Sequence, residues 1–153
     1  MSGVAIIDSG GANIASLKFA LRRLGVDATL TTDDKLLRDA SHVILPGVGA
    51  AADAMRRLNR SGLDELIPTL DQPVLGICLG MQLLAEASEE DDAECLGVFS
   101  GIARKLSASP ETPVPNMGWC PTSALRQHPL LHGIGDGSYF YFVHSYALPV
   151  DDY

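Results

Sequence analysis

The sequence predicts an α/β fold, namely a doubly wound, mainly parallel, flavodoxin-like sheet flanked by helices, with a small antiparallel annex. Short, β-branched apolar runs alternate with helical patterns through the first 87 residues. This cadence is typical of right-handed βαβ units, whose parallel sheet is covered on both faces. From Gly97 onward the pattern changes to short strands with Pro- and Gly-rich connectors, which indicates the annex.

The individual elements follow from apolar spacing and turn residues. Apolar runs that end in turn residues predict four buried strands, over 4–7, 28–31, 42–45 and 73–77. Helices are expected over 14–24, 50–58 and 79–87. The first helix has an N-cap candidate in Asn13 and a terminating Gly25. The later strands are expected within 98–106 and 139–147.

Composition limits the classes of function. The chain has 153 residues, 46% hydrophobic and 20% charged, which predicts one domain over residues 1–153. Its 11 Lys and Arg against 19 Asp and Glu give a net charge of −8, which argues against nucleic acid or an anionic membrane as partner. The acidic run 89–92 is expected to be a solvated loop.

Localisation is inferred from the N-terminus and the cysteines. The first residues, MSGVAIIDSGG, have no basic segment and only a four-residue apolar run, and no stretch of the chain is apolar enough to span a bilayer. Three cysteines without a Cys-x-x-Cys pair favour a reducing compartment. We therefore expect a cytoplasmic protein.

The most informative segment is Gly76-Ile77-Cys78-Leu79-Gly80, at the junction of a predicted strand and a predicted helix. A Gly-x-nucleophile-x-Gly pattern at such a junction is a nucleophile elbow, here with Cys in place of Ser. Larger side chains two positions either way would collide with the crossing backbone. The helix N-terminus favours the thiolate form of Cys78, and the Leu79 N–H is placed to stabilise an oxyanion. A lone cysteine is more often a small buried hydrophobe, as we expect for Cys95 and Cys120.

A second oxyanion element is predicted at Pro46-Gly47-Val48-Gly49, which follows the third strand. In a doubly wound sheet this strand neighbours the fourth, so its carboxyl end lies at the same edge as Cys78. The Val48 N–H is then a candidate second donor, after a peptide flip that glycine makes cheap.

The histidines predict neither a base nor a metal site. His144 lies in the aromatic run 139–146, where a packed or hydrogen-bonded histidine is the more common finding. His128 and His132 have helix-ligand spacing, but Pro129 and Gly133 interrupt them and no carboxylate lies beside them. No metal and no cofactor are expected.

Several segments together resemble the glutaminase subunit of imidazole glycerol phosphate synthase, a class I glutamine amidotransferase. They are LPGVGA (45–50), PVLGICLGMQLL (73–84), PNMGW (115–119), YFYFVHSYALP (139–149) and VAIIDSGGANIASLKFAL (4–21). The resemblance covers nearly the whole chain and implies the fold of that family.

The resemblance also implies a mechanism. Cys78 attacks the side-chain amide of glutamine, with the Val48 and Leu79 N–H groups as the oxyanion hole. A glutamyl thioester and ammonia form, and water then releases glutamate. The ammonia passes into a docked cyclase subunit, a (β/α)8 barrel, which forms imidazole glycerol phosphate and aminoimidazole carboxamide ribotide in histidine biosynthesis. Family positions match Gly49, Gln82, Ser145 and Tyr146 for glutamine binding, and Asn13 and Trp119 for the contact in the heterodimer.

One part of the family pattern is missing. The family completes its triad with a His-x-Glu pair, and none of His42, His128, His132 and His144 is followed two residues later by Glu. We expect a C-terminally truncated glutaminase that lacks its last strands and closing helix and is impaired as given. Acid–base help of this kind is typically worth ~10²–10⁴-fold.

Other readings remain open. The chain would be a non-catalytic cyclase-binding module if it keeps the partner contact without the triad. It would be a cysteine-elbow hydrolase, or an amidotransferase of another pathway, if a different synthase stimulates it. A nucleotide-binding protein is disfavoured, because residues 8–13 lack the Gly-x-Gly-x-x-Gly spacing.

Overall fold

A computed structural model describes residues 3–124 and 126–150. The chain forms two compact units. The first comprises Met1–Arg104 with Tyr146–Tyr153, and the second comprises Lys105–Ser145. The expectation of one domain over residues 1–153 stays a prediction.

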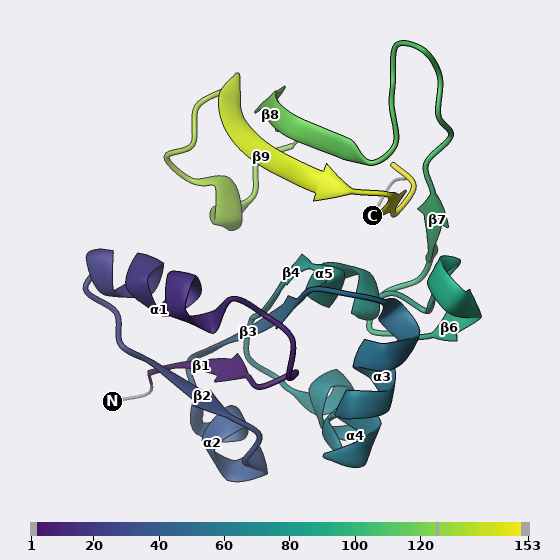
Figure 1. Ribbon diagram of the computed structural model, residues 1–153. Helices are drawn as coiled ribbons and strands as arrows, with labels where there is room; N and C mark the ends of the chain where they lie inside the picture. The colour runs from purple at the N-terminus through teal and green to yellow at the C-terminus, as the bar shows by residue number, and fades with distance from the viewer. Residues whose placement is uncertain (1–2, 125, 151–153) are drawn as a thin grey trace. The chain divides into compact units, whose positions relative to one another are not determined.

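The first unit is built on a four-stranded parallel sheet (Figure 1). Its strands are β1 (Val4–Ile7), β2 (Ala28–Thr31), β3 (His42–Gly47) and β4 (Val74–Cys78), in the order β2-β1-β3-β4. All three pairings are parallel, which confirms the predicted sheet. The third strand was expected to end at Leu45. It continues to Gly47 because Pro46 and Gly47 still pair with β4.

Helices cover both faces of this sheet. They are α1 (Ile14–Arg23), α2 (Asp34–Asp39), α3 (Ala51–Arg60), α4 (Leu63–Leu66) and α5 (Leu79–Leu83), with a 3₁₀ turn at Ile67–Thr69. In Figure 1, α1 lies on one side of the strands and α2 and α4 on the other. This is the arrangement that right-handed crossovers produce when the strand order reverses at β1.

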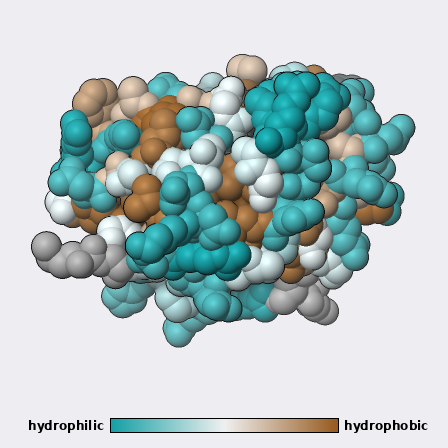
Figure 2. Space-filling view, turned by 90° about the horizontal axis from the view of Figure 1, so that it is seen from below, coloured by the Kyte–Doolittle hydropathy of each residue, from teal (hydrophilic) through white to brown (hydrophobic). Residues whose placement is uncertain are grey.

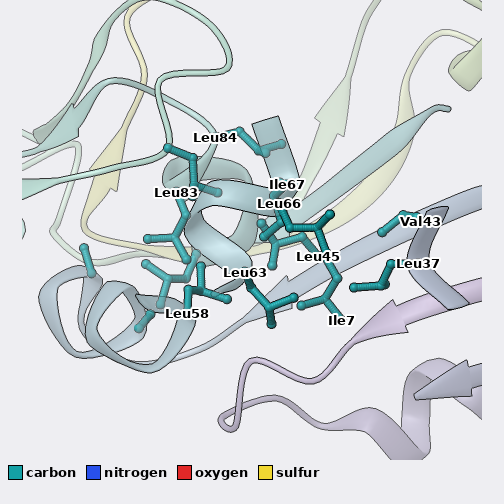
Figure 3. Packing of buried hydrophobic residues seen from close by; sticks show 14 of the residues in the cluster. Ile7, Leu37, Val43, Leu45, Leu58, Leu63, Leu66, Ile67, Leu83 and Leu84 are labelled. Atoms are coloured by element: carbon teal, nitrogen blue, oxygen red, sulfur yellow. The ribbon is translucent and has the colours of Figure 1, made fainter. Parts of the chain in front are cut away.

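The core lies mainly on the face opposite α1. Side chains alternate along a strand, so residues two apart share a face. Ile7 and Leu45 from the strands pack with Leu58 of α3, Leu63 of α4 and Leu83 of α5 (Figure 3), and all five are fully or almost fully buried. By contrast, α1 has no buried residue.

The annex is divided between the units. The first unit holds a second sheet in the order β10-β7-β5-β6, formed by β5 (Ala87–Ser88), β6 (Ala93–Glu94), β7 (Ile102–Lys105) and β10 (Tyr146–Ala147). The second unit is built on an antiparallel pair, β8 (Asn116–Thr122) and β9 (Ser138–His144), with a 3₁₀ turn at Pro129–Leu131 between them. The antiparallel annex predicted from Gly97 onward is confirmed in the β8–β9 pair. The antiparallel β5–β6 pair precedes Gly97 and was not predicted, and β5 and β7 pair in parallel.

Two predicted bounds are wrong for one physical reason. The helix expected over 79–87 ends at Leu83, and the strand expected over 98–106 begins only at Ile102. The backbone N–H groups of residues 96–99 donate to the carbonyls of residues 83–85 at 2.8–3.2 Å. These bonds occupy the carbonyl of Leu83, the last residue of α5, and those of the two residues after it, so the helix does not continue. They also keep residues 98 and 99 out of a strand.

Polar residues dominate the face shown in Figure 2, with smaller hydrophobic groups between them. Among the described residues, no helix is long and apolar enough to cross a membrane. Within the same residues, no three His, Cys, Asp or Glu side chains gather as a metal ion would require.

Candidate functional site

Cys78 lies where β4 ends and α5 begins. Its φ is 55° and its ψ is −118°, and it is one of three non-glycine residues with a positive φ in the described chain. A non-glycine residue in this region is strained and persists only where its surroundings hold it. The side chain is exposed. The prediction of a strained, reachable thiol at this junction agrees with the geometry.

Two glycines make this turn possible. A Cβ atom at Gly76 would lie 2.5 Å from the Cα of Met81, and one at Gly80 would lie 1.8 Å from the carbonyl oxygen of Leu45. Real Cβ atoms essentially never approach other atoms below 3.0 Å. The predicted collision is therefore real on both sides of Cys78, with α5 on one side and β3 on the other.

The neighbouring strand brings the second oxyanion candidate to Cys78. Gly47 pairs with Cys78 in the parallel β3–β4 register. A Cβ at Gly47 would lie 2.8 Å from the Gly80 nitrogen, so a third glycine is needed for this close approach. Val48 follows directly, with an exposed side chain, and Gly49 has a φ of +95° that favours glycine. The predicted adjacency of the PGVG segment and the elbow is present.

Glu90 caps α3, the helix that follows this segment, and sequence reasoning missed it. Its carboxylate oxygen accepts a hydrogen bond of 3.0 Å from the Ala51 N–H, at the start of α3. The N-cap residue Ala50 offers no side-chain acceptor, so Glu90 satisfies this helix end instead. The expectation that residues 89–92 form a solvated loop is wrong at Glu90. The only sequence signal was the missing cap at Ala50.

Gln82 lies one turn into α5 and is 6% exposed. Its Nε2 donates to the Tyr146 carbonyl oxygen over 3.5 Å, so two of the predicted glutamine-binding residues are adjacent. Its Oε1 is buried and has no hydrogen-bond partner in the described chain. A buried orphan acceptor is costly, and a ligand that donates to it would remove that cost.

The other predicted residues lie apart from the elbow or in the second unit. Ser145 ends the second unit, directly before Tyr146 in sequence. Trp119 is 67% exposed on β8 and meets the Tyr141 ring edge-on, at 5.5 Å between ring centroids. Asn13 is exposed and caps α1 as predicted, because its side-chain oxygen accepts from the Ser16 N–H at 3.2 Å.

The remaining histidine and cysteine expectations can be compared with the geometry. His144 Nε2 lies 3.1 Å from the Asn116 side-chain nitrogen, the hydrogen-bonded setting expected of it. Cys95 is half-buried, and burial raises the pKa of its thiol to about 11. Cys120 is also half-buried. Of the three thiols, only that of Cys78 is exposed.

These features define a class of protein. A parallel α/β sheet carries a strained, exposed cysteine at a strand–helix turn, and a glycine-flanked segment lies in register beside it. Such an elbow is used for nucleophilic attack on a carbonyl carbon.

Comparisons with known proteins agree with that class. The family model "Glutamine amidotransferase class-I" matches residues 5–151. The chain is 52% identical over 150 residues to the imidazole glycerol phosphate synthase subunit HisH of Xylella fastidiosa, and this alignment covers 98% of the chain and 75% of the relative. A HisH 2 subunit of Legionella pneumophila is 51% identical over the same shares of each chain.

A solved structure gives the same fold. A crystal structure of a glutamine amidotransferase matches 92% of this chain and 71% of its own, with a TM-score of 0.68 and 18% identity. The chain belongs to the class-I glutamine amidotransferase family, in the group of HisH subunits of imidazole glycerol phosphate synthase.

Proposed function

We propose that this chain is the glutaminase of imidazole glycerol phosphate synthase and supplies ammonia for histidine biosynthesis. Cys78 attacks the side-chain carbonyl carbon of glutamine, the C–N bond breaks, and ammonia leaves as a glutamyl thioester remains. Water then hydrolyses the thioester to glutamate and the free thiol. The observation that carries the proposal is the exposed Cys78 at φ 55°, between two glycines that tolerate no Cβ.

Four residues are proposed, from where they lie, to stabilise the oxyanion or to bind glutamine. The N–H groups of Val48 and Leu79 stabilise the oxyanion, because Val48 follows the residue paired with Cys78 and Leu79 follows Cys78 itself. The orphan Oε1 of Gln82 accepts a hydrogen bond from glutamine, and Tyr146 lies beside Gln82. Gly49 and Ser145 complete the glutamine site by their match to the family.

The proposed partner is the cyclase subunit. Ammonia is captured by protons in bulk water, so a synthase that uses it benefits from direct transfer between docked subunits. In the second unit, the β8–β9 register places Met117, Trp119 and Pro121 opposite Val143, Tyr141 and Tyr139. We call these six residues the ribbon face. Five of them are large hydrophobic side chains at least 50% exposed, which favours a docking surface with Trp119 as an aromatic anchor. Asn13 is proposed as a second contact, from the family match.

Labelling with a chloroketone analogue of glutamine tests the function. We expect one adduct per chain, on Cys78, formed more slowly in the presence of glutamine and unaffected by asparagine. Cys95 and Cys120 serve as internal controls within the same molecule. Equal labelling of all three thiols, or a Cys78 rate that glutamine does not change, would reject the proposed glutaminase. Capture of a cyclase without Cys78 labelling would favour the non-catalytic module.

A further inference from the structure

Arg57 lies in the last turn of α3, and its side chain contacts the loop that follows β1. Its Nε donates a hydrogen bond of 2.7 Å to the Ser9 carbonyl oxygen. Its Nη1 pairs with Asp53 one turn earlier on the same helix. The side chain is 28% exposed, against 62% for the neighbouring Arg56, which pairs with the same Asp53. Arg57 is thus the arginine of this pair that packs against the protein.

The loop is shaped to accept this side chain. A Cβ at Gly10 would lie 3.1 Å from the Arg57 Cδ, and a Cβ at Gly11 would lie 3.1 Å from its Nη2. Both distances are tighter than nine in ten real Cβ contacts. Gly10 also has a φ of +72°, which favours glycine. The side chain of Arg57 therefore lies along the loop backbone where side chains are absent.

The other side of the same loop contacts the oxyanion segment. Ser9 is 3% exposed, and its hydroxyl donates to the Pro46 carbonyl oxygen at 2.9 Å. A Cβ at Gly11 would lie 3.4 Å from the Val48 carbonyl oxygen, so the backbone of Gly11 passes close to Val48. The loop of residues 9–11 is therefore held between Arg57 and residues 46–48, of which Gly47 pairs with Cys78.

From these contacts we infer that Arg57 is a positioning residue for the oxyanion hole. It holds the loop of residues 9–11 against residues 46–48 and so fixes the backbone that carries the Val48 N–H beside Cys78. The inference rests on the proposed function, which assigns the Val48 N–H to the oxyanion. Arginine suits the task because its planar fork donates to Ser9 from Nε and to Asp53 from Nη1 at once. A lysine keeps the charge near Asp53 and loses the fixed second donor.

A purely structural role is the alternative, and two reactions of Cys78 separate it from positioning. Acylation by a glutamate γ-(p-nitrophenyl) ester passes through a tetrahedral oxyanion, and its phenolate leaving group needs no proton. Alkylation by iodoacetamide displaces iodide at a saturated carbon and forms no oxyanion. Loss of positioning slows only the first reaction, whereas a general disturbance of the elbow changes both.

The test uses the 153-residue chain with Arg57→Met, Arg57→Lys and, as matched control, Arg56→Met. Losing an oxyanion donor costs ~10²–10³-fold, so a misplaced one is expected to slow acylation of Arg57→Met by about 10- to 100-fold. Arg57→Lys should show a smaller decrease, and Arg56→Met should match the wild type. Iodoacetamide rates should be equal in all four proteins, with p-nitrophenolate release and adduct mass as the readouts and thermal melting as the check of folding.

Three outcomes overturn the inference. The first is a folded Arg57→Met or Arg57→Lys protein that is acylated at the wild-type rate. The second is an equal decrease in the rates of acylation and alkylation. The third is failure of both Arg57 variants to fold. Failure of the proposed function gives a different result, because the wild-type chain itself would then be acylated no faster at Cys78 than at Cys120.

Discussion

Replacing Gly80 with alanine sets two physical effects against each other. Gly80 lies in α5, and intrinsic helix propensity alone favours alanine by about 1 kcal/mol. The new Cβ, however, would lie 1.8 Å from the Leu45 carbonyl oxygen and 2.7 Å from the Leu45 carbonyl carbon. Restoring even the 3.0 Å limit moves the helix or β3 by more than an ångström. Both β3 and α5 are anchored in the core, because Leu45 of β3 and Leu83 of α5 are fully buried.

The steric effect is expected to win. Overpacking a well-packed core costs ~1–3 kcal/mol, and the upper end applies here because the obstacle is backbone, which cannot rotate away. Subtracting the propensity gain leaves a net loss of about 2 kcal/mol, or a melting temperature lower by roughly 4–8 °C.

Thermal and urea unfolding followed by circular dichroism measure this loss. Gly3→Ala is the matched control, since its Cβ would meet only the Asp27 carbonyl oxygen at an ordinary 3.7 Å. It should change stability by less than ~0.5 kcal/mol. A Gly80→Ala protein as stable as the wild type would refute the steric account of the elbow.

Three further outcomes are expected. Burial raises the pKa of the Cys95 thiol from 9.0 in the unfolded chain to about 11, so the free energy of unfolding should fall as pH rises between these values. Urea unfolding should show a smaller fall in Cys95→Ala. A parallel fall in both proteins would contradict the assignment. Trp119→Ala should weaken binding to the proposed cyclase partner by more than ~2 kcal/mol by calorimetry, while Leu36→Ala, at an exposed apolar residue on α2, should not. Because no histidine of this chain is followed two residues later by Glu, glutamine turnover with the proposed cyclase partner should be ~10²–10⁴-fold below that of a relative that has the His-x-Glu pair. Equal turnover would show that another group of this chain serves as the base.

The parts of the fold that local physics determines were predictable. Buried parallel strands appear as short apolar runs, and this placed β1, β2 and β4 within one residue of their observed bounds. The elbow was partly predictable for a related reason, since the clash that Gly76 avoids is with Met81, within the tight turn itself. The clash that Gly80 avoids is with Leu45 of the neighbouring strand β3.

What depends on distant partners was not predictable. The early end of α5 at Leu83 depends on N–H donors from residues 96–99, which the spacing of apolar residues does not reveal. The cap that Glu90 provides to α3 joins residues 39 apart, and the contact of Arg57 with Ser9 joins residues 48 apart. In each case the sequence contains both partners and no periodic signal links them.

This difference explains why the site itself was the easier inference. Its geometry is set by backbone packed against backbone, because a Cβ at Gly47, Gly76 or Gly80 would lie less than 3.0 Å from a neighbouring backbone atom. Main-chain N–H groups, not side chains, are the proposed oxyanion donors, so the chemistry depends on how closely three segments approach. Longer side chains such as Glu90 and Arg57 then act from outside: Glu90 caps the start of α3, and Arg57 binds the loop that follows β1. It follows that substitutions at the glycines should disrupt folding and reactivity together, whereas substitutions at the supporting side chains should separate the two.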